Sequence, residues 1–389
     1  MTATTPSTRY PAATPVPTPL VVAGHPILPV GPVRLYTCGI TPYDVTHLGH
    51  ASTFVWADLL VSVARASGAE VLSARNVTDI DDVLTAEAER RGRLPDELAV
   101  TQEFLFERDM RALGVAEPHQ KPRAHRHVPA VQRLAAALLA ADRAYEIDGH
   151  VLFRGGDLPA RAGLAVDEAL AASRDFGDQD GLPERESPFD VPVWRPSAEG
   201  QPSWPSPWGW GRPGWHAECA AMAMATLGTS IDVLLGGQDL AFPHHAYQVA
   251  MVEAASGVTP FARSVVHVGE VRRDGEKMAK STGNLVLVAD LLETAPGSVV
   301  RLMLLHRDWR QPWDWDPAGL DRAADTLDRL HAAAAGPTQQ GAAAPGQVLR
   351  VLAADLDVPA AIELALGEGG EAARLLISVL GLGDATSAG

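Results

Sequence analysis

Residues 33–50 read VRLYTCGITPYDVTHLGH, and this run contains the first unit of the predicted fold. Its first five residues alternate like a strand, and residues 39–43 supply turn chemistry. Apolar side chains then recur at helical spacing over residues 51–64. The stretch therefore predicts a strand, a loop and a helix, with Cys38 near the end of the strand.

The same alternation of strands and helices continues downstream. The run AEVLSARNVTDIDD at residues 69–82 predicts a strand that ends in a polar loop, and residues 96–114 and 128–144 have the periodicity of helices. Further strands are predicted within residues 228–245 and 263–275. Strands that alternate with helices imply an α/β fold, in which a parallel sheet is covered on both faces and ligands bind at the carboxyl ends of the strands.

Composition shifts divide the chain into five parts. We expect a disordered N-terminal arm at residues 1–30, rich in Thr, Pro and Ala and without the features of a signal peptide. Residues 31–145 and 206–295 are predicted to form the two halves of the α/β domain. The Gly-, Pro- and Trp-rich residues 146–205 between them indicate an inserted, loop-rich segment, and residues 296–389 predict a C-terminal helical bundle.

Composition also limits the class of protein. With 389 residues and 46% hydrophobic side chains the chain can bury a sizeable core, and it has no apolar run long enough to span a bilayer. The two cysteines give little support for a disulfide scaffold. A net charge of −16 argues against a large nucleic-acid surface. We expect a cytoplasmic monomer that has no membrane partner.

Two pairs of basic side chains carry the first chemical signal. His47 and His50 are three residues apart at the start of the predicted helix, where an anion is favoured. Lys277 and Lys280 lie on the polar loop DGEKMAKSTGN, which is suited to binding a triphosphate. Taken singly, the histidines are better explained as surface or capping residues, and the lysines can be explained as part of a solvated basic loop.

Together the pairs resemble a known signature. HLGH at residues 47–50 and KMAKS at residues 277–281 are similar to the HIGH and KMSKS motifs of class I aminoacyl-tRNA synthetases, in the same order and at a fitting separation. The resemblance implies a Rossmann-type nucleotide-binding sheet and an enzyme that forms adenylates from ATP. His47 and His50 would then stabilise the α-phosphate region, while Lys277 and Lys280 would hold the departing pyrophosphate.

Cys38, Cys219 and His244 are candidate metal ligands because they come from three segments that can meet above one sheet. Three ligands distant in sequence suit a zinc ion with an open fourth position, which a substrate thiolate can fill. Such a site selects cysteine over serine, since zinc binds a thiolate far better than a neutral hydroxyl. Each residue alone is equally typical of a buried core.

The order of five motifs makes the resemblance specific. YTCGITPYDVTHLGH, NVTDIDD, RPGWHAEC, GGQDLAFPHH and EKMAKSTGN are similar, over residues 30–316, to cysteinyl-tRNA synthetases and to the related cysteine ligases of mycothiol biosynthesis. Pro42, Val83, Trp313 and Trp315 resemble the ligases more closely. Residues 282–389 are short for a helical bundle followed by an anticodon-binding domain, so we expect no tRNA partner.

The ligase resemblance implies a two-step reaction. L-cysteine attacks ATP to form cysteinyl adenylate and pyrophosphate, and the amine of glucosaminyl inositol then displaces AMP to form an amide. It also implies one zinc ion per subunit, held by the Cys38, Cys219 and His244 set, and a magnesium ion with ATP. Four residues would surround the cysteine, Asp239 on its ammonium group: Thr41, Thr78, Trp215 and Asp239.

Some positions depart from these families. Ala279 replaces a serine, which removes a hydroxyl contact of about 0.5–1.5 kcal/mol. Ala246 lies near the usual glutamate after FPHH, Gln238 lies in LLGGQD where relatives have GGGSD, and Arg272 and Arg273 replace smaller or apolar residues. The acceptor amine can therefore differ. A paralogous ligase for another amine, a truncated cysteinyl-tRNA synthetase and a non-catalytic nucleotide-binding descendant stay open as alternatives.

Overall fold

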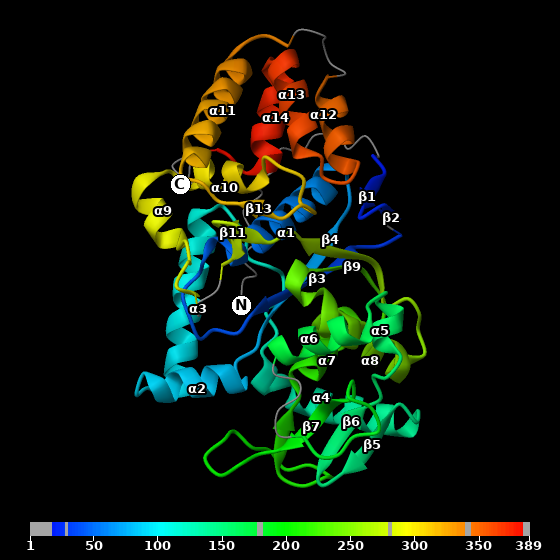
Figure 1. Cartoon of the computed structure of the whole chain (residues 1–389). Coiled ribbons are helices and arrows are strands. Elements are labelled where there is room, and N and C mark those ends of the chain that lie inside the picture. Colours follow the sequence, from blue (N-terminus) through cyan, green and yellow to red (C-terminus); the bar gives the residue numbers. More distant parts are fainter. Residues whose placement is uncertain (1–17, 28–29, 177–181, 279–281, 339–343, 384–389) are drawn as a thin grey trace, which may run out of the picture.

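A four-stranded parallel sheet lies at the centre of the computed structural model, which describes residues 18–27, 30–176, 182–278, 282–338 and 344–383 (Figure 1). The strand order is β10-β9-β3-β4, with every neighbouring pair parallel. The predicted α/β fold with a parallel sheet is therefore confirmed. The strands span β3 (Val33–Ile40), β4 (Val71–Val77), β9 (Ile231–Gly237) and β10 (Ala262–Val268).

Helices cover both faces of this sheet, and Figure 1 shows them above and below the strands. One face packs against α1 (Leu48–Ala66), and the other against α7 (Trp215–Leu227), on which α4 (Ala124–Ala140) and α8 (Ala246–Ser256) rest. Successive side chains of β3 point to opposite faces of the sheet. Leu35 therefore packs in the hydrophobic core on the α1 side, and Tyr36 packs in the core on the α7 side. All four strands thus end at one edge, where the loops gather.

The segment between the two halves of the domain is an antiparallel sheet, so the expectation of a loop-rich insert at residues 146–205 is wrong. Its strands are β5 (Ala144–Ile147), β6 (His150–Phe153), β7 (Val191–Pro196) and β8 (Gly211–Pro213), with helices α5 (Leu158–Arg161) and α6 (Val166–Asp175) between β6 and β7. The proline- and glycine-rich run belongs partly to edge strand β8. Gly211 is required there, because a Cβ would lie 2.3 Å from the Arg195 carbonyl oxygen.

Residues expected to belong to a disordered arm form a short hairpin, β1 (Leu20–Val22) and β2 (His25–Ile27). Three apolar side chains of this hairpin are buried, and Ser264 Oγ donates a hydrogen bond of 2.8 Å to the Val22 carbonyl. The prediction of disorder over residues 1–30 is therefore wrong for residues 18–27. Burial of apolar side chains against the sheet overrides the local composition. The rest of the predicted arm lies outside the described residues, apart from residue 30.

The remaining elements flank the sheet. Helices α2 (Asp82–Arg90) and α3 (Pro95–Ala112) follow β4, and a small sheet joins β11 (Val271–Arg273), β12 (Glu276–Lys277) and β13 (Trp313–Asp314). The C-terminal part is helical, and its last four helices stand above the sheet in Figure 1. The helices of this part are α9 (Val288–Thr294), α10 (Gly297–Leu305), α11 (Ala318–Ala335), α12 (Ala344–Ala353), α13 (Val358–Glu368) and α14 (Gly370–Leu380), of which α11 to α14 are the last four. In the described part of the chain, the helices are too short or too polar to traverse a bilayer.

A buried arginine joins the C-terminal helices to the sheet domain. Arg301 of α10 is fully buried, and its guanidinium donates to Asp58 Oδ2 at 2.5 Å, to the Leu113 carbonyl and to the Leu380 carbonyl. Asp58 of α1 also accepts from the Ala116 backbone N–H at 2.8 Å. One ion pair therefore links α1, the loop after α3, α10 and the end of α14.

Replacing this arginine tests that link. Arg301→Met is expected to lower the free energy of unfolding by about 3–5 kcal/mol, because it leaves the Asp58 carboxylate buried without its partner. Urea titration of the full chain measures the change. The matched control is Arg350→Met, at an exposed position on α12, for which we expect a change within about 0.5 kcal/mol. A loss below about 1 kcal/mol for Arg301→Met would contradict the assignment.

Candidate active site

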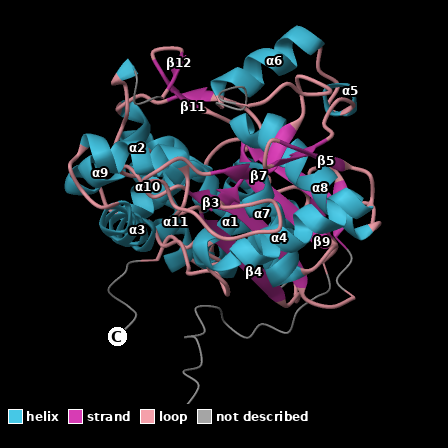
Figure 2. Cartoon of the chain, turned by 90° about the horizontal axis from the view of Figure 1, so that it is seen from below, coloured by secondary structure: helices cyan, strands magenta, loops and turns pink. Residues whose placement is uncertain are grey.

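A cavity of about 810 Å³ opens at the carboxyl ends of the parallel strands. Its walls come from the end of β3, the starts of α1, α2 and α7, the β7 and β8 strands, and the loops after β9 and β10. In Figure 2, α6 and β11 lie at the same edge of the molecule, and both border this cavity. Parallel α/β sheets bind ligands at this place because the connecting loops diverge there.

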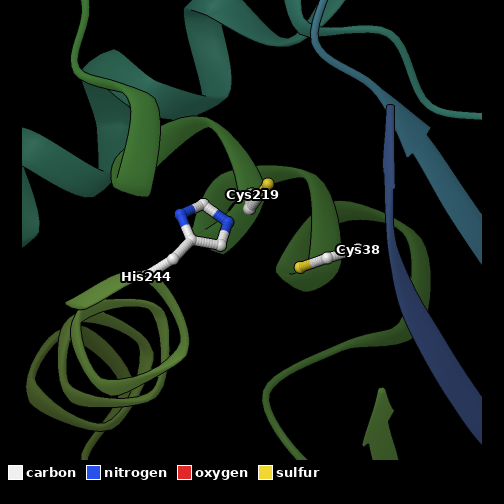
Figure 3. A group of neighbouring side chains, drawn as sticks. All are labelled: Cys38, Cys219 and His244. Atoms are coloured by element: carbon white, nitrogen blue, oxygen red, sulfur yellow. The ribbon is translucent and has the colours of Figure 1, made fainter. Parts of the chain in front are cut away.

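Three potential metal ligands meet beside the cavity. Cys38 lies on β3, Cys219 on α7 and His244 on η2 (Ala241–His245), and all three side chains are buried. Their ligand atoms lie within 4.8 Å of one another. Figure 3 shows the side chains of Cys38, Cys219 and His244 next to one another, carried by three different elements. Cys38 is thus brought next to two residues that lie far from it in the sequence, because the elements that carry the three side chains meet at one place.

The chemistry of this cluster fits a transition-metal ion. Two sulfurs and an imidazole are the donors that zinc and related ions prefer. Burial and the neighbouring His216 lower the pKa of His244 well below its usual range, so its imidazole is neutral and able to coordinate. Hydrogen bonding to Cys38 and burial raise the pKa of the Cys219 thiol. A bound cation would favour the thiolate and reverse that effect.

Gln248 of α8 is a neighbour of the cluster that sequence reasoning missed. It is fully buried, and its Oε1 accepts a hydrogen bond from Cys38 Sγ at 3.4 Å. Among the described residues, its Nε2 has no hydrogen-bond partner. Turning the amide by 180° would point an N–H donor at a Cys38 thiolate. The sequence signal that could have identified Gln248 is its spacing from His244. Residues four apart lie on the same face of a helix, one turn from each other.

Stacked rings enclose His244. The Trp215 ring lies 4.1 Å from the His244 ring with an angle of 24° between the planes, and Phe176 stacks on Trp215 at 5.6 Å. His216 Nδ1 lies 2.9 Å from His244 Nδ1, and the His216 ring stacks on Tyr247 at 5.0 Å. Sequence reasoning assigned Trp215 but missed His216. These contacts fix the orientation of the His244 ring.

The paired histidines lie at the start of α1, as expected. His47 is the N-cap residue, and its Nδ1 accepts a hydrogen bond from the Gly49 N–H at 3.2 Å. The His47 and His50 ring centroids are 3.9 Å apart, and both residues line the cavity. Desolvation by the cavity walls and the neighbouring His50 lower the pKa of His47 to about 3, and desolvation also lowers the pKa of His50. Both rings are therefore neutral near pH 7.

Lys277 faces a carboxylate that sequence reasoning assigned to a different substrate. Its Nζ lies 2.9 Å from Asp239 Oδ2 and 3.9 Å from Glu270 Oε1. Lys277 and Asp239 both line the cavity, so the predicted nucleotide lysine and the predicted ammonium-binding carboxylate are brought together. Lys280 and Ala279 lie outside the described residues.

The two threonines differ in their relation to the cavity. Thr41 lines the cavity, and its hydroxyl lies close enough to the Asp81 carboxyl group to lower the pKa of Asp81. Thr78 is buried, donates from its hydroxyl to the Ile40 carbonyl at 3.2 Å, and is not among the cavity-lining residues. The structure thus brings Thr41, Trp215 and Asp239 to one cavity but leaves Thr78 beneath its wall.

Comparison with known proteins gives one family. The family described as tRNA synthetases class I (C) catalytic domain matches residues 26–325. The chain is 41% identical to a cysteine–tRNA ligase of Rhodospirillum rubrum over 85% of this chain and 73% of that protein. It is 42% identical to an L-cysteine:1D-myo-inositol 2-amino-2-deoxy-alpha-D-glucopyranoside ligase of a Parafrankia species, over 88% of this chain and 81% of that protein.

A solved structure shares the fold. Methionyl-tRNA synthetase of Mycobacterium tuberculosis, in complex with methionyl-adenylate, matches with a TM-score of 0.63 and 18% identity over 90% of this chain and 88% of that chain. The class I synthetase-type fold expected from the sequence is therefore confirmed.

The cluster predicts metal binding that depends on its histidine. His244→Asn is expected to weaken the affinity for Co²⁺ by at least about 10–100-fold, the range found when residues that only orient ligands are removed. Competition with a chelator, followed through the sulfur-to-cobalt absorption band, measures the affinity. His306→Asn, which changes an exposed histidine directly after α10, is the matched control and is expected to bind as the unaltered chain does. Equal affinities for both variants would remove His244 from the site.

Proposed function

Since this chain belongs to the family of class I tRNA synthetase (C) catalytic domains, we propose that it is an ATP-dependent ligase that activates L-cysteine. The product of activation is cysteinyl adenylate, and the amine of an amino sugar such as glucosaminyl inositol then receives the cysteinyl group. The observation that carries this proposal is the cysteine and histidine cluster lying beside a cavity that His47, His50 and Lys277 also line. The residues proposed to activate the carboxylate thus lie in the same cavity as the residues proposed to bind the thiol of the substrate.

The nucleotide end of the cavity suits the first step. A carboxylate oxygen of cysteine bonds to the α-phosphorus of ATP, and the bond to pyrophosphate breaks. His47 and His50 can donate hydrogen bonds to the phosphate as it gains negative charge, next to the positive end of α1. Lys277, together with Lys280 and a magnesium ion, would neutralise the pyrophosphate that leaves.

The cysteine and histidine cluster and the residues around it would recognise the substrate cysteine. Cys38, Cys219 and His244 would hold one Zn²⁺ per subunit, and Gln248 would donate a hydrogen bond to the Cys38 thiolate. When bound, zinc supplies an open position for the substrate thiolate, which separates cysteine from serine. The rest of the amino acid would contact three of the residues that the sequence suggested: Thr41, Trp215 and Asp239. Thr78 would act indirectly, because its hydroxyl donates to the Ile40 carbonyl and it does not line the cavity.

The ion pair of Lys277 with Asp239 supports an ordered exchange of partners. Asp239 is about one-third exposed and Lys277 about half exposed, so the pair is open to substrates. A cysteine ammonium group would replace Lys277 on Asp239, and the freed lysine would turn to the phosphates of ATP. The exchange keeps every charge paired, so little electrostatic free energy is lost.

In the second step, the acceptor amine attacks the carbonyl carbon of cysteinyl adenylate. The ammonium form of the acceptor first gives up one proton to become the free amine. A C–N bond then forms, the C–O bond to AMP breaks, AMP leaves with the electron pair, and the nitrogen loses a second proton. Relatives named as cysteine ligases of an amino-sugar inositol support this acceptor. Relatives named as cysteine–tRNA ligases are equally similar, so tRNA is the second candidate acceptor. A different small amine is the third.

Exchange kinetics test the activation step. ATP–pyrophosphate exchange is expected with L-cysteine and to exceed exchange with L-serine by roughly 10⁴-fold, because a site that bonds a specific polar group rejects the analogue that lacks it. Adding glucosaminyl inositol should produce AMP and an amide detectable by mass spectrometry. Charging of cysteine tRNA without amide formation would favour the second acceptor, and absence of any cysteine-dependent exchange would refute the proposal.

Replacement of the cavity lysine tests the nucleotide end. Lys277→Met is expected to lower kcat of exchange about 100-fold, since it removes one positive charge from the developing pyrophosphate. Lys121→Met is the matched control, because Lys121 pairs with Glu107 and Glu117 outside the cavity. Exchange by that variant should equal the unaltered rate. Equal rates for both variants would exclude Lys277 from the nucleotide site.

A further inference from the structure

The cavity has a second polar wall, formed by elements different from those that carry the histidine pair and Lys277. Asp81 and Asp82 come from the start of α2, Arg195 from β7 and Glu218 from the first turn of α7, and all four line the cavity. Asp81 shares the cavity lining with Thr41 and with the metal-cluster residue Cys38, which lies three residues before Thr41. This wall therefore adjoins the cluster.

Asp82 already has its countercharges. Its Oδ1 lies 3.0 Å from Arg212 Nε, and its Oδ2 lies 3.1 Å from Arg212 Nη2 and 3.2 Å from Arg195 Nη1. Arg212 is buried and also donates to the Pro196 carbonyl at 2.9 Å. Asp82 and the two arginines thus form a closed group that fixes α2 against the inserted sheet.

Asp81 has no such countercharge. Its Oδ1 accepts the Val83 N–H at 2.8 Å as the N-cap of α2, and within the described ranges no basic side chain lies within 4.0 Å of it. Burial in the cavity wall raises the pKa of Asp81 to about 6, so the carboxylate is mostly ionised at neutral pH. Asp82 raises this pKa further, while Thr41 and Arg195 oppose the rise.

Glu218 adds a second carboxyl group without a complete set of partners. Its side chain is only 3% exposed, yet it lines the cavity. Its Oε2 has no hydrogen-bond partner in the part of the chain that the structure describes. A buried polar atom without a partner costs free energy, so its retention in a cavity wall points to a ligand that supplies the missing hydrogen bond.

We propose that Asp81 and Glu218 form the acceptor subsite and bind the ammonium group and a neighbouring hydroxyl of a hydroxyl-rich primary amine. This proposal rests on the proposed function and adds the residues that recognise the second substrate. The Asp81 carboxylate, which has no ion-pair partner among the described residues, attracts a cation and repels a phosphodiester chain. The subsite therefore favours a small cationic acceptor over the phosphate-rich end of a tRNA.

The substitution Asp81→Asn tests the role of the negative charge without removing the helix cap. Asparagine caps a helix about as well as aspartate, so the Val83 hydrogen bond is kept while the negative charge is lost. With glucosaminyl inositol as the probe, kcat/KM for the amine should fall about 10–100-fold, mainly through KM. That fall should exceed any fall in cysteine-dependent ATP–pyrophosphate exchange by at least about tenfold.

The matched control is Asp96→Asn, which changes an exposed aspartate in the first turn of α3, and it should leave both activities unchanged. Glu218→Gln, with its metal content measured, is a second variant expected to raise KM for the amine. If Asp81→Asn and Glu218→Gln leave KM for the amine unchanged, or lower amide formation and exchange in parallel, the subsite is wrong. Absence of exchange in the unaltered protein would instead refute the proposed function itself.

Discussion

The convergence of Cys38, Cys219 and His244 is the constraint on which the rest of the site depends. The ligand atoms lie within 4.8 Å of one another although the residues belong to a strand, a helix and a π-helical turn. The parallel sheet makes this possible, because β3 and β9 end at the same edge and the chain after each strand enters the same space. A shift of β3 by one residue would turn Cys38 to the opposite face of the sheet.

The electrostatics of the cavity follow from the same arrangement. Neutral histidines and Lys277 lie at the start of α1 and on β12, whereas the Asp81 carboxylate, which lacks a countercharge among the described residues, lies at the start of α2. The metal-ligand cluster adjoins both regions of the wall. An anionic nucleotide and a cationic acceptor are thus favoured at different parts of one cavity, which would direct the two substrates to the shared cysteinyl carbonyl from separate places.

Sequence patterns predicted the α/β sheet well because its strands and helices have distinct periods and its motifs stand at strand ends. The three cluster residues were predictable because sulfur donors are rare in this chain, with two cysteines in all. The antiparallel insert was missed, since its proline and glycine content hides the strands that bury Trp194. Gln248 and the Lys277–Asp239 pair were missed because they depend on distances across the fold that no local pattern encodes.

X-ray absorption at the zinc edge tests the central claim most directly, because it counts the sulfur atoms around the metal. The account predicts two sulfur ligands at about 2.3 Å in the protein alone and three after L-cysteine is added, with no third sulfur after L-serine. A sulfur count that stays the same when cysteine is added, or a metal without two sulfur ligands at the outset, would contradict it.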